Sequence, residues 1–519
     1  MLDLAQIHSL LSLRFENQKI TNLKSLPSPF SLQNVQEGAN LVKEAFLQGK
    51  RILIVGDYDA DGILSTAVMV RFFKAIGIKN FSYIIPNRFS DGYGITQSVL
   101  AKQERADLII TVDNGITAIE VAKECKKQGQ TLIITDHHTP KDELPDALII
   151  NPKVSGFIQE EICGCLVAWY FCAGIKQVLG VEFDLSSLIE FVGIAIISDV
   201  MPLLEINRSL LKFAIKKYPT SIYPCFEVLR KAYKEIDVEC ISYYISPLLN
   251  ASGRMGEADV ALNFVLTDTL EEAQKYYKAL QNLNTQRKNI QASLEQIALE
   301  KVIETQECVL AYGEDWHEGV LGILAGRLAG RFGKSAFVLS AKNGRYQGSG
   351  RSANGVNLLK SVEKLPSGVC EFGGHAKAMG ISICSEYIQE FASMFKAHYE
   401  QEEEKEGFLG EIGIGVLGNE MLRVIESFAP YGEGNPEPMF CIRELEIIES
   451  KKIGKEKEHT SLKCRAFGRP IKAVAFFKEI QESKILYDVN FYLKKDLFTQ
   501  QPVLHIQSYN LCHSLSKLS

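Results

Sequence analysis

The stretch Ile52-Leu-Ile-Val-Gly-Asp-Tyr-Asp-Ala-Asp-Gly62 joins a short apolar run to three alternating acids. An uninterrupted apolar run of this length is typical of a strand that is buried on both faces. Similar runs recur along the first third of the chain, and helix-period stretches separate several of them. This alternation predicts a parallel, doubly wound α/β sheet. The runs are Ile52–Val55, Tyr83–Ile85, Leu108–Val112, Leu132–Ile134 and Ala147–Ile150, and the helical stretches are Ile63–Ile76 and Ile116–Gln128.

Potential metal ligands follow three of these runs at the point where each strand ends. The first run is followed by Asp57, the third by Asp113 and the fourth by Asp136-His137-His138. A single acid in such a place is an ordinary turn former or helix cap. Three sites at the carboxyl edge of one parallel sheet, where ligands bind in this fold class, instead predict a metal site.

The acids Asp57, Asp59 and Asp61 occupy alternate positions. In extended backbone such side chains project to one face, so we expect three carboxylates that repel one another unless a cation lies between them. Gly62 then allows a tight turn into a helix that begins near Ile63. An EF-hand loop also begins with alternating acids, but its twelfth position is a valine here, which disfavours that kind of calcium site.

Imidazole beside carboxylates favours manganese, or another transition metal, over magnesium alone. His137 and His138 supply imidazole, and Asp199 enlarges the set of ligands enough for two ions. Two neighbouring ions can activate a water molecule and stabilise the charge on a phosphoryl group. The sequence therefore predicts a metal-dependent phosphoesterase with two bound ions, Mn²⁺ or Mg²⁺.

The composition is that of a globular protein of several domains. The length of 519 residues predicts about three domains, and the apolar fraction is 46%. No apolar run reaches the ~18 residues that a membrane span needs, and the N-terminus lacks the basic region of a signal peptide. Twelve cysteines without a CxxC pair predict reduced thiols in a cytoplasmic protein and exclude a zinc ribbon.

Later segments predict further domains and a polyanion surface. A long polar segment, Glu271–Val302, predicts one connecting helix, and a glycine-rich α/β unit follows it. Beyond the acidic run Glu400–Glu406, the strand-like segments Ile471–Phe477, Ile485–Leu493 and Val503–Ser508 predict a small β-barrel. Six basic residues and no acid lie within residues 319–351, and nine basic residues against two acids within residues 451–478. The barrel is expected to grip nucleic-acid backbone, with a β-domain used only for packing as the alternative.

Four motifs of the first domain resemble those of the DHH phosphoesterase superfamily. They are Asp57-Tyr-Asp-Ala-Asp-Gly62, Val112-Asp-Asn-Gly115, Asp136-His-His138 and Ser198-Asp199. The resemblance implies that Asp113 bridges both metals and that Asp57 is a further ligand or supports one. It also implies that Asp136 orients the histidines and that His138 contacts the scissile phosphate. The metal ligands that the resemblance implies are Asp59, Asp61, Asp113, His137 and Asp199.

Five later stretches, in order along the chain, resemble the RecJ family, which degrades single-stranded DNA from its 5′ end. The chain departs from that family at Leu166, where a second glycine is expected close after Gly164. The stretches are Pro247-Leu-Leu-Asn-Ala-Ser-Gly-Arg-Met255, Trp316-His-Glu-Gly-Val-Leu-Gly322, Ser349-Gly-Arg-Ser352, Gly373-Gly-His375 and Pro430-Tyr-Gly-Glu-Gly-Asn-Pro436.

These stretches contain the predicted substrate-binding residues. The segment from Ser349 to Ser352 offers a tight turn and a guanidinium group suited to phosphate, or is a plain hairpin turn. Gly373-Gly374-His375 allows close backbone approach and one donor to a phosphate oxygen, or is a helix-capping glycine pair. The segment from Trp316 opens a helix whose N-terminus binds an anion or whose glycines permit close packing. By resemblance, the predicted substrate-binding residues are Arg254, Ser349, Arg351, Gly373, Gly374 and His375.

The resemblance implies a single-stranded-DNA-specific 5′-to-3′ exonuclease. It would release 5′-mononucleotides by a two-metal mechanism in DNA repair and recombination. The partners implied are single-stranded DNA, a single-strand-binding protein and a helicase, with no membrane.

The expected architecture is a parallel-sheet DHH catalytic domain, a long connecting helix, a second α/β domain and a C-terminal OB-like β-barrel. A short-oligonucleotide or cyclic-dinucleotide phosphodiesterase would lack the barrel, and a non-catalytic scaffold would have lost the acids. The expected boundaries are residues 1–265 for an N-terminal segment with the catalytic domain, 266–303 for the helix, 304–405 for the substrate-binding domain and 408–519 for the barrel.

Overall fold

The structure is a computed structural model that describes residues 1–399, 407–413, 415–454, 457–478, 480, 484–496 and 499–511. The acidic run at residues 400–406, which we expect to be a solvated helix end or linker, lies outside these residues. The chain forms two compact units. The larger comprises Pro27–Met201 and Phe213–Glu403, and the smaller comprises Met1–Leu26, Pro202–Lys212 and Glu404–Ser519.

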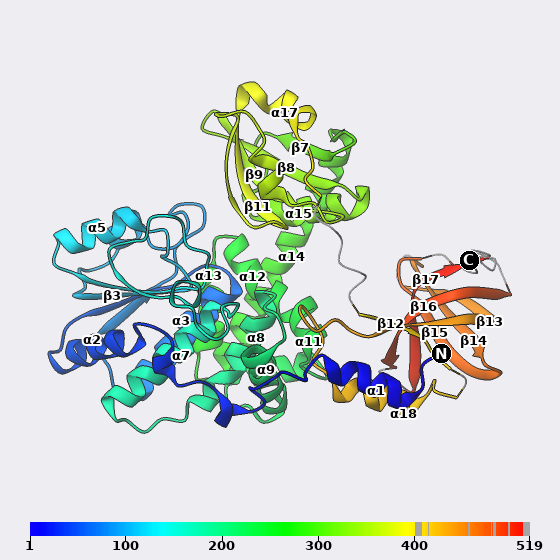
Figure 1. The fold of residues 1–519 in the computed structure, drawn as a ribbon. Coiled ribbons are helices and arrows are strands. Elements are labelled where there is room, and N and C mark those ends of the chain that lie inside the picture. The colour runs from blue at the N-terminus through cyan, green and yellow to red at the C-terminus, as the bar shows by residue number, and fades with distance from the viewer. Residues whose placement is uncertain are drawn as a thin grey trace. The chain divides into compact units, whose positions relative to one another are not determined.

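The larger unit begins with a five-stranded parallel sheet in the order β2-β1-β3-β4-β5. Helix α5 covers one face of this sheet, and α2 and α7 cover the other (Figure 1). Strands β1 and β3 are buried along their whole length, which explains why every residue in them except Thr111 is apolar. The predicted doubly wound sheet is confirmed. Its strands are β1 (Ile52–Val55), β2 (Phe81–Ile84), β3 (Leu108–Val112), β4 (Thr131–Thr135) and β5 (Leu148–Ile150), and its helices are α2 (Val35–Leu47), α3 (Ala60–Ala75), α4 (Gln97–Ala101), α5 (Ile119–Lys127), α6 (Pro152–Ser155) and α7 (Gly164–Leu179).

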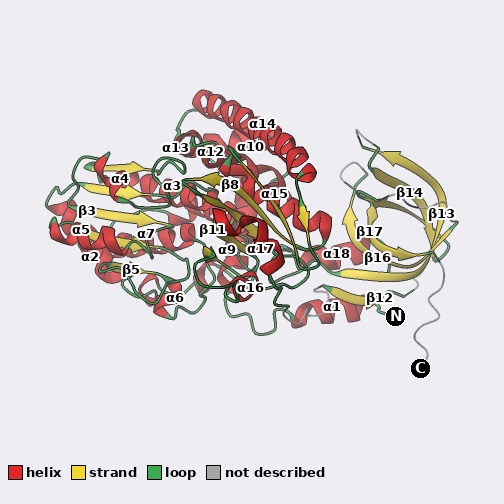
Figure 2. Cartoon of the chain, turned by 90° about the horizontal axis from the view of Figure 1, so that it is seen from above, coloured by secondary structure: helices red, strands yellow, loops and turns green. Residues whose placement is uncertain are grey.

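A run of helices follows the sheet and ends in α14 (Leu270–Glu300), an uninterrupted helix (Figure 2). Thr269 caps its N-terminus by accepting a hydrogen bond from the N–H of Glu272. The predicted connecting helix is therefore confirmed. The other helices are α8 (Ile189–Ser198), α9 (Glu205–Lys217), α10 (Pro224–Ala232), α11 (Val238–Cys240), α12 (Ser246–Arg254) and α13 (Ala258–Leu266).

A mixed six-stranded sheet in the order β10-β11-β9-β8-β7-β6 follows α14. Strands β7 and β8 pair in parallel, whereas the other neighbours are antiparallel. This is the second α/β domain that the sequence predicts. Its elements are β6 (Ile303–Glu304), β7 (Cys308–Gly313), α15 (Glu318–Phe332), β8 (Ser335–Lys342), β9 (Arg345–Arg351), α16 (Leu358–Val362), β10 (Cys370–Gly374), β11 (Ala378–Cys384) and α17 (Ile388–Met394).

The smaller unit contains a closed five-stranded barrel in the order β13-β14-β15-β17-β16, and pairing of β13 with β16 closes it. Figure 2 shows the long strands curving around a common interior. The parallel pairing of β15 with β17 in an otherwise antiparallel barrel is the OB arrangement that the sequence predicts. The elements are β12 (Phe408–Glu411), α18 (Asn419–Ser427), β13 (Met439–Ile453), β14 (His459–Ala466), β15 (Arg469–Ala475), β16 (Ile485–Lys495) and β17 (Pro502–Asn510).

The N-terminal helix α1 (Leu4–Leu13) belongs to this barrel unit, because Ile7 and Leu11 are buried in the barrel's hydrophobic core. Two segments of the predicted first domain, Met1–Leu26 and Pro202–Lys212, thus fold with the C-terminal strands. The predicted domain boundaries otherwise stay a prediction. In the part of the chain that the structure describes, no helix is both long and apolar enough to span a membrane, and every cysteine is a free thiol.

Candidate metal centre

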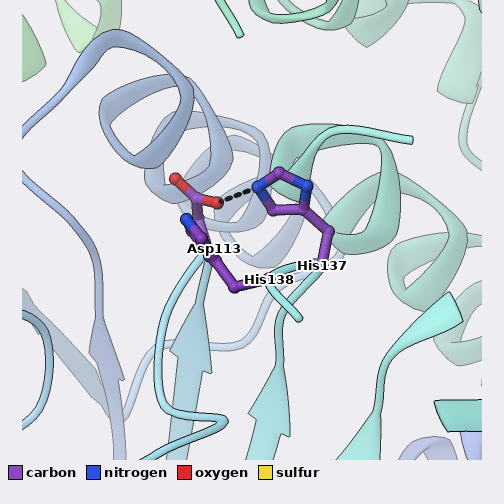
Figure 3. A group of neighbouring side chains, drawn as sticks. All are labelled: Asp113, His137 and His138. Atoms are coloured by element: carbon purple, nitrogen blue, oxygen red, sulfur yellow. Dashed lines mark ion pairs between the residues drawn. The ribbon is translucent and has the colours of Figure 1, made fainter. Parts of the chain in front are cut away.

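Three adjacent parallel strands end at one edge of the first sheet, and an acid follows each of them. Asp57 follows β1, Asp113 follows β3, and Asp136 follows β4. Because β3 pairs with both neighbours, these residues come together, and Figure 3 shows Asp113 pointing toward the ring of His137. Asp113 has a φ of 65°, a left-handed conformation that is uncommon outside glycine and that tends to occur at functional sites.

The structure corrects the predicted geometry of the acidic triplet. Helix α3 begins at Ala60 rather than near Ile63, so the chain is no longer extended beyond Asp59. Asp59 is the N-cap, and its carboxylate accepts a hydrogen bond of 3.0 Å from the N–H of Gly62. Asp61 lies in the first helical turn. Acids are favoured at this end of a helix, so the alternating acids mark a capped helix start instead of a strand.

Gly62 lies inside α3 and is not a turn residue, contrary to the prediction. A Cβ atom at this position would lie 2.5 Å from the Cβ of Asp57 and 2.7 Å from its backbone. The glycine is therefore needed because the first turn of α3 packs directly against Asp57.

The acids and His137 form two neighbouring groups that can each hold a cation, with the ligand atoms of each group within 4.8 Å of one another. Oδ1 of Asp113 lies 3.2 Å from Nε2 of His137 and so connects the two groups. The same nitrogen lies 3.4 Å from Asp199 and 3.8 Å from Asp61. The first group is Asp57, Asp59 and Asp113, and the second is Asp61, His137 and Asp199. A third set within the same distance, Asp113, His137 and His138, shares one residue with each of them (Figure 3).

Burial and mutual repulsion oppose ionisation of these carboxylates. Burial, followed by the negative charge of Asp59, raises the pKa of Asp61 to about 7. Burial and then neighbouring acids also raise the pKa of Asp57, Asp113 and Asp199. A divalent cation removes the repulsion by supplying opposite charge, so the arrangement suits a metal-bound state.

The donor atoms fit a metal such as manganese. Oδ1 of Asp113 and Oδ2 of Asp199 are buried without a hydrogen-bond partner among the described residues. Burial, followed by the charge of His138, lowers the pKa of His137 to about 3, so its ring is neutral and able to ligate. Buried acceptors without donors are rare because they cost free energy, and a cation would satisfy both. Carboxylate oxygen together with imidazole nitrogen is a donor set that suits Mn²⁺.

The first turn of helix α7 contacts two of the acids in the metal groups. The backbone N–H groups of Gly164 and Cys165, at its first turn, donate hydrogen bonds of 2.6 and 2.9 Å to the two carboxylate oxygens of Asp61. A Cβ atom on Gly164 would lie 2.3 Å from Oδ1 of Asp113. The glycine is thus required where α7 meets the site. Leu166, the departure from the family pattern, is fully buried within α7.

Asp136 positions the second histidine. Its Oδ1 accepts a hydrogen bond of 2.8 Å from Nδ1 of His138, and its Oδ2 accepts one of 2.9 Å from the N–H of Ile116. Burial alone would lower the pKa of His138, but the hydrogen bond and charge of Asp136, aided by Asp199, raise it to about 9. His138 is therefore a cation at neutral pH, suited to a negatively charged oxygen.

An aromatic and basic group beside His138 was not predicted from the sequence. The hydroxyl of Tyr93 lies 3.4 Å from Nε2 of His138, and its ring packs edge-on against Tyr58. The guanidinium of Arg88 lies over the Tyr58 ring at 5.1 Å. Tyr93 is 46% exposed and so is available to a ligand. Because β2 ends at Ile84, the rule about strand ends that identified the acids would also have pointed to this loop.

The predicted substrate-binding residue Arg254 ends helix α12 and is enclosed by close backbone packing. Its guanidinium donates a hydrogen bond of 3.0 Å to the carbonyl of Gly319, at the start of α15. Burial lowers the pKa of Arg254 to about 10, and the positive charges of Arg88, Arg287 and Arg351 add to this shift. The carboxylate of Asp59 opposes this shift, so Arg254 interacts with both positive and negative side chains.

Ser349 and Arg351 lie at the end of strand β9, which corrects the predicted tight turn and hairpin turn, while the phosphate-binding role of Arg351 stays a prediction. The glycines beside them are needed for sheet packing, since a Cβ on Gly348 would lie 2.0 Å from the carbonyl of Val338. Arg351 donates to the hydroxyl of Ser349 at 3.0 Å. Both side chains lie over Gly322 of α15.

The remaining predicted residues lie in a β-hairpin. Gly373 and Gly374 end β10, and His375 turns toward β11, with its N–H bonded to the carbonyl of Ala378 at 2.8 Å. The pair therefore does not cap a helix. After burial and the charge of His138, the charge of His375 also lowers the pKa of His137. His317 caps α15, with Nδ1 accepting from the N–H of Gly319, and a Cβ on that glycine would lie 2.1 Å from the carbonyl oxygen of Arg254.

Comparison with known proteins assigns these features to a family. Residues 51–196 match the N-terminal domain of the DHH family, residues 304–401 the DHHA1 domain, and residues 410–508 the RecJ OB domain. The single-stranded-DNA-specific exonuclease RecJ of Haemophilus influenzae is 30% identical over 90% of this chain and 89% of its own length. That of Salmonella typhimurium is 32% identical over 86% and 84%. The crystal structure of RecJ from Thermus thermophilus in complex with Mn²⁺ superposes with a TM-score of 0.82 at 26% identity, covering 97% of this chain and 74% of that one.

The matched ranges cover the first sheet, the second domain and the barrel, and the resemblance to the RecJ family found in the sequence is confirmed. The chain belongs to the RecJ family of single-stranded-DNA-specific exonucleases, within the DHH phosphoesterases.

Proposed function

We propose that this chain degrades single-stranded DNA from the 5′ end and releases 5′-mononucleotides with two divalent cations. The observation that supports the chemistry is the pair of buried acid and histidine groups that share Asp113. The named activity of the full-length relatives supports the substrate. The arginine groups beside the acids support the polarity, because they provide a place for a terminal phosphate.

In this proposal Asp57, Asp59 and Asp113 hold one cation, and Asp61, His137 and Asp199 hold the other. Asp113 lies closest to both groups and is the proposed shared ligand. The bound cations would supply an activated water and charge neutralisation at the phosphoryl group. The proposal takes Asp57 as a full ligand, one of the two roles that the sequence resemblance left open, because Asp57 groups with Asp59 and Asp113.

Residues of the chain perform the remaining steps. His138, protonated and oriented by Asp136, donates a hydrogen bond to a non-bridging oxygen of the scissile phosphate. The hydroxyl of Tyr93 contacts the same ring, 3.4 Å from Nε2 and 3.5 Å from Nδ1. Arg254, Arg351 and Ser349 receive the 5′-terminal phosphate, and the Gly373-Gly374-His375 hairpin approaches the nucleotide backbone. One nucleotide would then separate the phosphate site from the metals, which gives mononucleotide products.

The barrel is proposed to bind single-stranded DNA. Phe476 and Phe477 are 45% and 80% exposed, so they are available for base stacking and do not belong to the barrel core. Phe467 packs against the core instead. Interaction with a single-strand-binding protein and a helicase, cytoplasmic location, and a role in DNA repair and recombination are further parts of the proposal.

The test is a comparison of substrates with purified protein and Mn²⁺. Single strands labelled at either end, duplex DNA and a dinucleotide are incubated with the native chain and with Asp113→Asn as the inactive control. We expect mononucleotide release from the 5′ end of single strands alone. Release from the 3′ end would refute the polarity, and preference for the dinucleotide would assign the chain to the short-oligonucleotide phosphodiesterases.

A further inference from the structure

One face of helix α12 contacts the segments of chain that carry the proposed metal ligands. The motif Pro247–Met255 forms most of this helix, and of its residues only Arg254 has a role in the proposed function. Ser246, Asn250 and Gly253 are separated by four and three residues, so they lie on one face of the helix. All three belong to the larger unit, as do the proposed ligands.

Asn250, in the middle of this face, completes the N-terminal cap of α3. Its Oδ1 accepts a hydrogen bond of 2.9 Å from the N–H of Ala60, the first residue of α3. The first N–H groups of a helix have no partner within the helix, and Asp59 already serves that of Gly62. Ala60 lies between Asp59 and Asp61, which belong to different metal groups. The bond therefore holds the chain between a ligand of one group and a ligand of the other.

Gly253, one turn further along α12, packs against the same segment. A Cβ atom on Gly253 would lie 2.0 Å from the carbonyl oxygen of Tyr58 and 2.9 Å from its carbonyl carbon. Tyr58 separates Asp57 from Asp59, the two acids that this segment contributes to the first metal group. The absence of a side chain thus lets α12 approach the backbone between these two ligands.

Ser246, at the other end of the face, contacts the chain beside the second metal group. Its buried hydroxyl shares a hydrogen bond of 2.6 Å with the hydroxyl of Ser198. Ser198 ends α8 and directly precedes the proposed ligand Asp199. At ~1.5 Å per residue, Ser246 and Gly253 are about 10 Å apart along the helix. One helix therefore contacts the backbone or the neighbouring residue of ligands in both groups.

We propose that α12 is a brace that holds the ligands of the two metal groups in place relative to one another, with Ser246, Asn250 and Gly253 as positioning residues. Without metal the acids repel one another, and this repulsion favours their separation. The brace opposes that separation through backbone and hydroxyl contacts, so it leaves the carboxylate oxygens available to the cations. This role rests on the proposed function of the acids as metal ligands.

The test measures binding of Mn²⁺ to the metal-free, full-length protein by isothermal titration. Ser246→Ala removes the hydrogen bond beside Asp199, so we expect about tenfold weaker binding at the second group alone. Gly253→Ala displaces the chain between Asp57 and Asp59, and we expect a loss of similar size at the first group alone. The matched control is Ser252→Ala, because Ser252 is a buried serine of the same helix whose hydroxyl donates to the carbonyl of Leu249 at 2.7 Å. The control should bind Mn²⁺ at both groups as the native chain does.

Two ligand variants, Asp57→Asn and Asp199→Asn, assign the binding events, since each removes a ligand from one group only. If neither variant changes Mn²⁺ binding, the ligand assignment fails, which is distinct from failure of the brace. If the assignment holds and Ser246→Ala binds Mn²⁺ as Ser252→Ala does, the brace is overturned. An equal loss at both groups in Ser246→Ala would also overturn it, because general destabilisation would then explain the effect. Ser246→Ala decides the outcome even if Gly253→Ala fails to fold, since it adds no atoms to the protein.

Discussion

Substitution of Gly164 by alanine probes the packing of α7 against the metal groups. The added Cβ would lie 2.3 Å from Oδ1 of Asp113 and 2.6 Å from its Cβ and Cγ, whereas ordinary van der Waals contact begins at 3.4 Å. Asp113 is 1% exposed and is packed against α7 on the side where the added Cβ would lie. Its carboxylate must therefore move by about 1 Å, or α7 must retreat and lose its hydrogen bonds to Asp61.

The expected loss follows from this displacement. A misplacement of about 1 Å in a catalytic group can lower the rate ~100-fold, which corresponds to about 2.7 kcal/mol of transition-state stabilisation. Stability should fall by about 1–3 kcal/mol, as in other overpacked cores. Because Asp113 is the proposed shared ligand, the affinity for Mn²⁺ should fall as well.

The assay measures kcat for mononucleotide release from 5′-labelled single strands at saturating Mn²⁺, together with the Mn²⁺ dissociation constant. Gly330→Ala is the matched control, because Gly330 lies in helix α15 with nothing within 4 Å of an added Cβ. That variant should keep native activity and gain up to about 1 kcal/mol of stability. Native kcat and native Mn²⁺ affinity in Gly164→Ala would refute the reasoning, because the close contact with Asp113 would then have no consequence.

Three further predictions concern the site and the barrel. In the presence of a chelator, the free energy of unfolding should fall as the pH rises from about 4 to about 7. The reason is that burial raises the pKa of Asp61 to about 7 from its usual 3.8, so the folded state binds more protons than the unfolded one. Urea titrations at pH 5 and 8 measure the change in stability, and Asp61→Asn should make that change smaller. Equal unfolding midpoints of the native chain at the two pH values would contradict the prediction. Arg351→Lys should raise KM about tenfold for 5′-phosphorylated strands only, because lysine cannot reproduce the planar fork; an equal rise for 5′-hydroxyl strands would oppose the phosphate assignment. Phe477→Ala should weaken the binding of single-stranded DNA by about 1–3 kcal/mol. It should not lower the unfolding midpoint, since the ring is 80% exposed. Unchanged affinity in fluorescence titrations would exclude Phe477 as a residue on which bases stack.

The sequence predicted those parts of the molecule in which local pattern and tertiary structure agree. The apolar runs of β1 and β3 are buried on both faces, and the residues after them meet because parallel strands end together. The long polar helix was equally clear, because nothing between Leu270 and Glu300 interrupts it.

Prediction from local sequence pattern failed where the pattern arises from a tertiary contact and not from the secondary structure that it usually indicates. Alternating acids are typical of an extended strand, but Asp59 caps a helix. The cap depends on a hydrogen bond to the N–H of Gly62, which the spacing of residues in the sequence does not reveal. The glycines around Ser349 resemble a turn, although they are needed because strands and Phe337 pack closely against them. The docking of Ile7 into the barrel joins segments some four hundred residues apart, which no local signal encodes.

The measurement that tests the central claim most directly is a crystal structure with Mn²⁺, with the ions located by anomalous scattering at the manganese edge. The account predicts two peaks about 3.5–4 Å apart. One should lie among Asp57, Asp59 and Asp113, and the other among Asp61, His137 and Asp199. Peaks that avoid Asp113, or a single ion at full occupancy under saturating Mn²⁺, would contradict it.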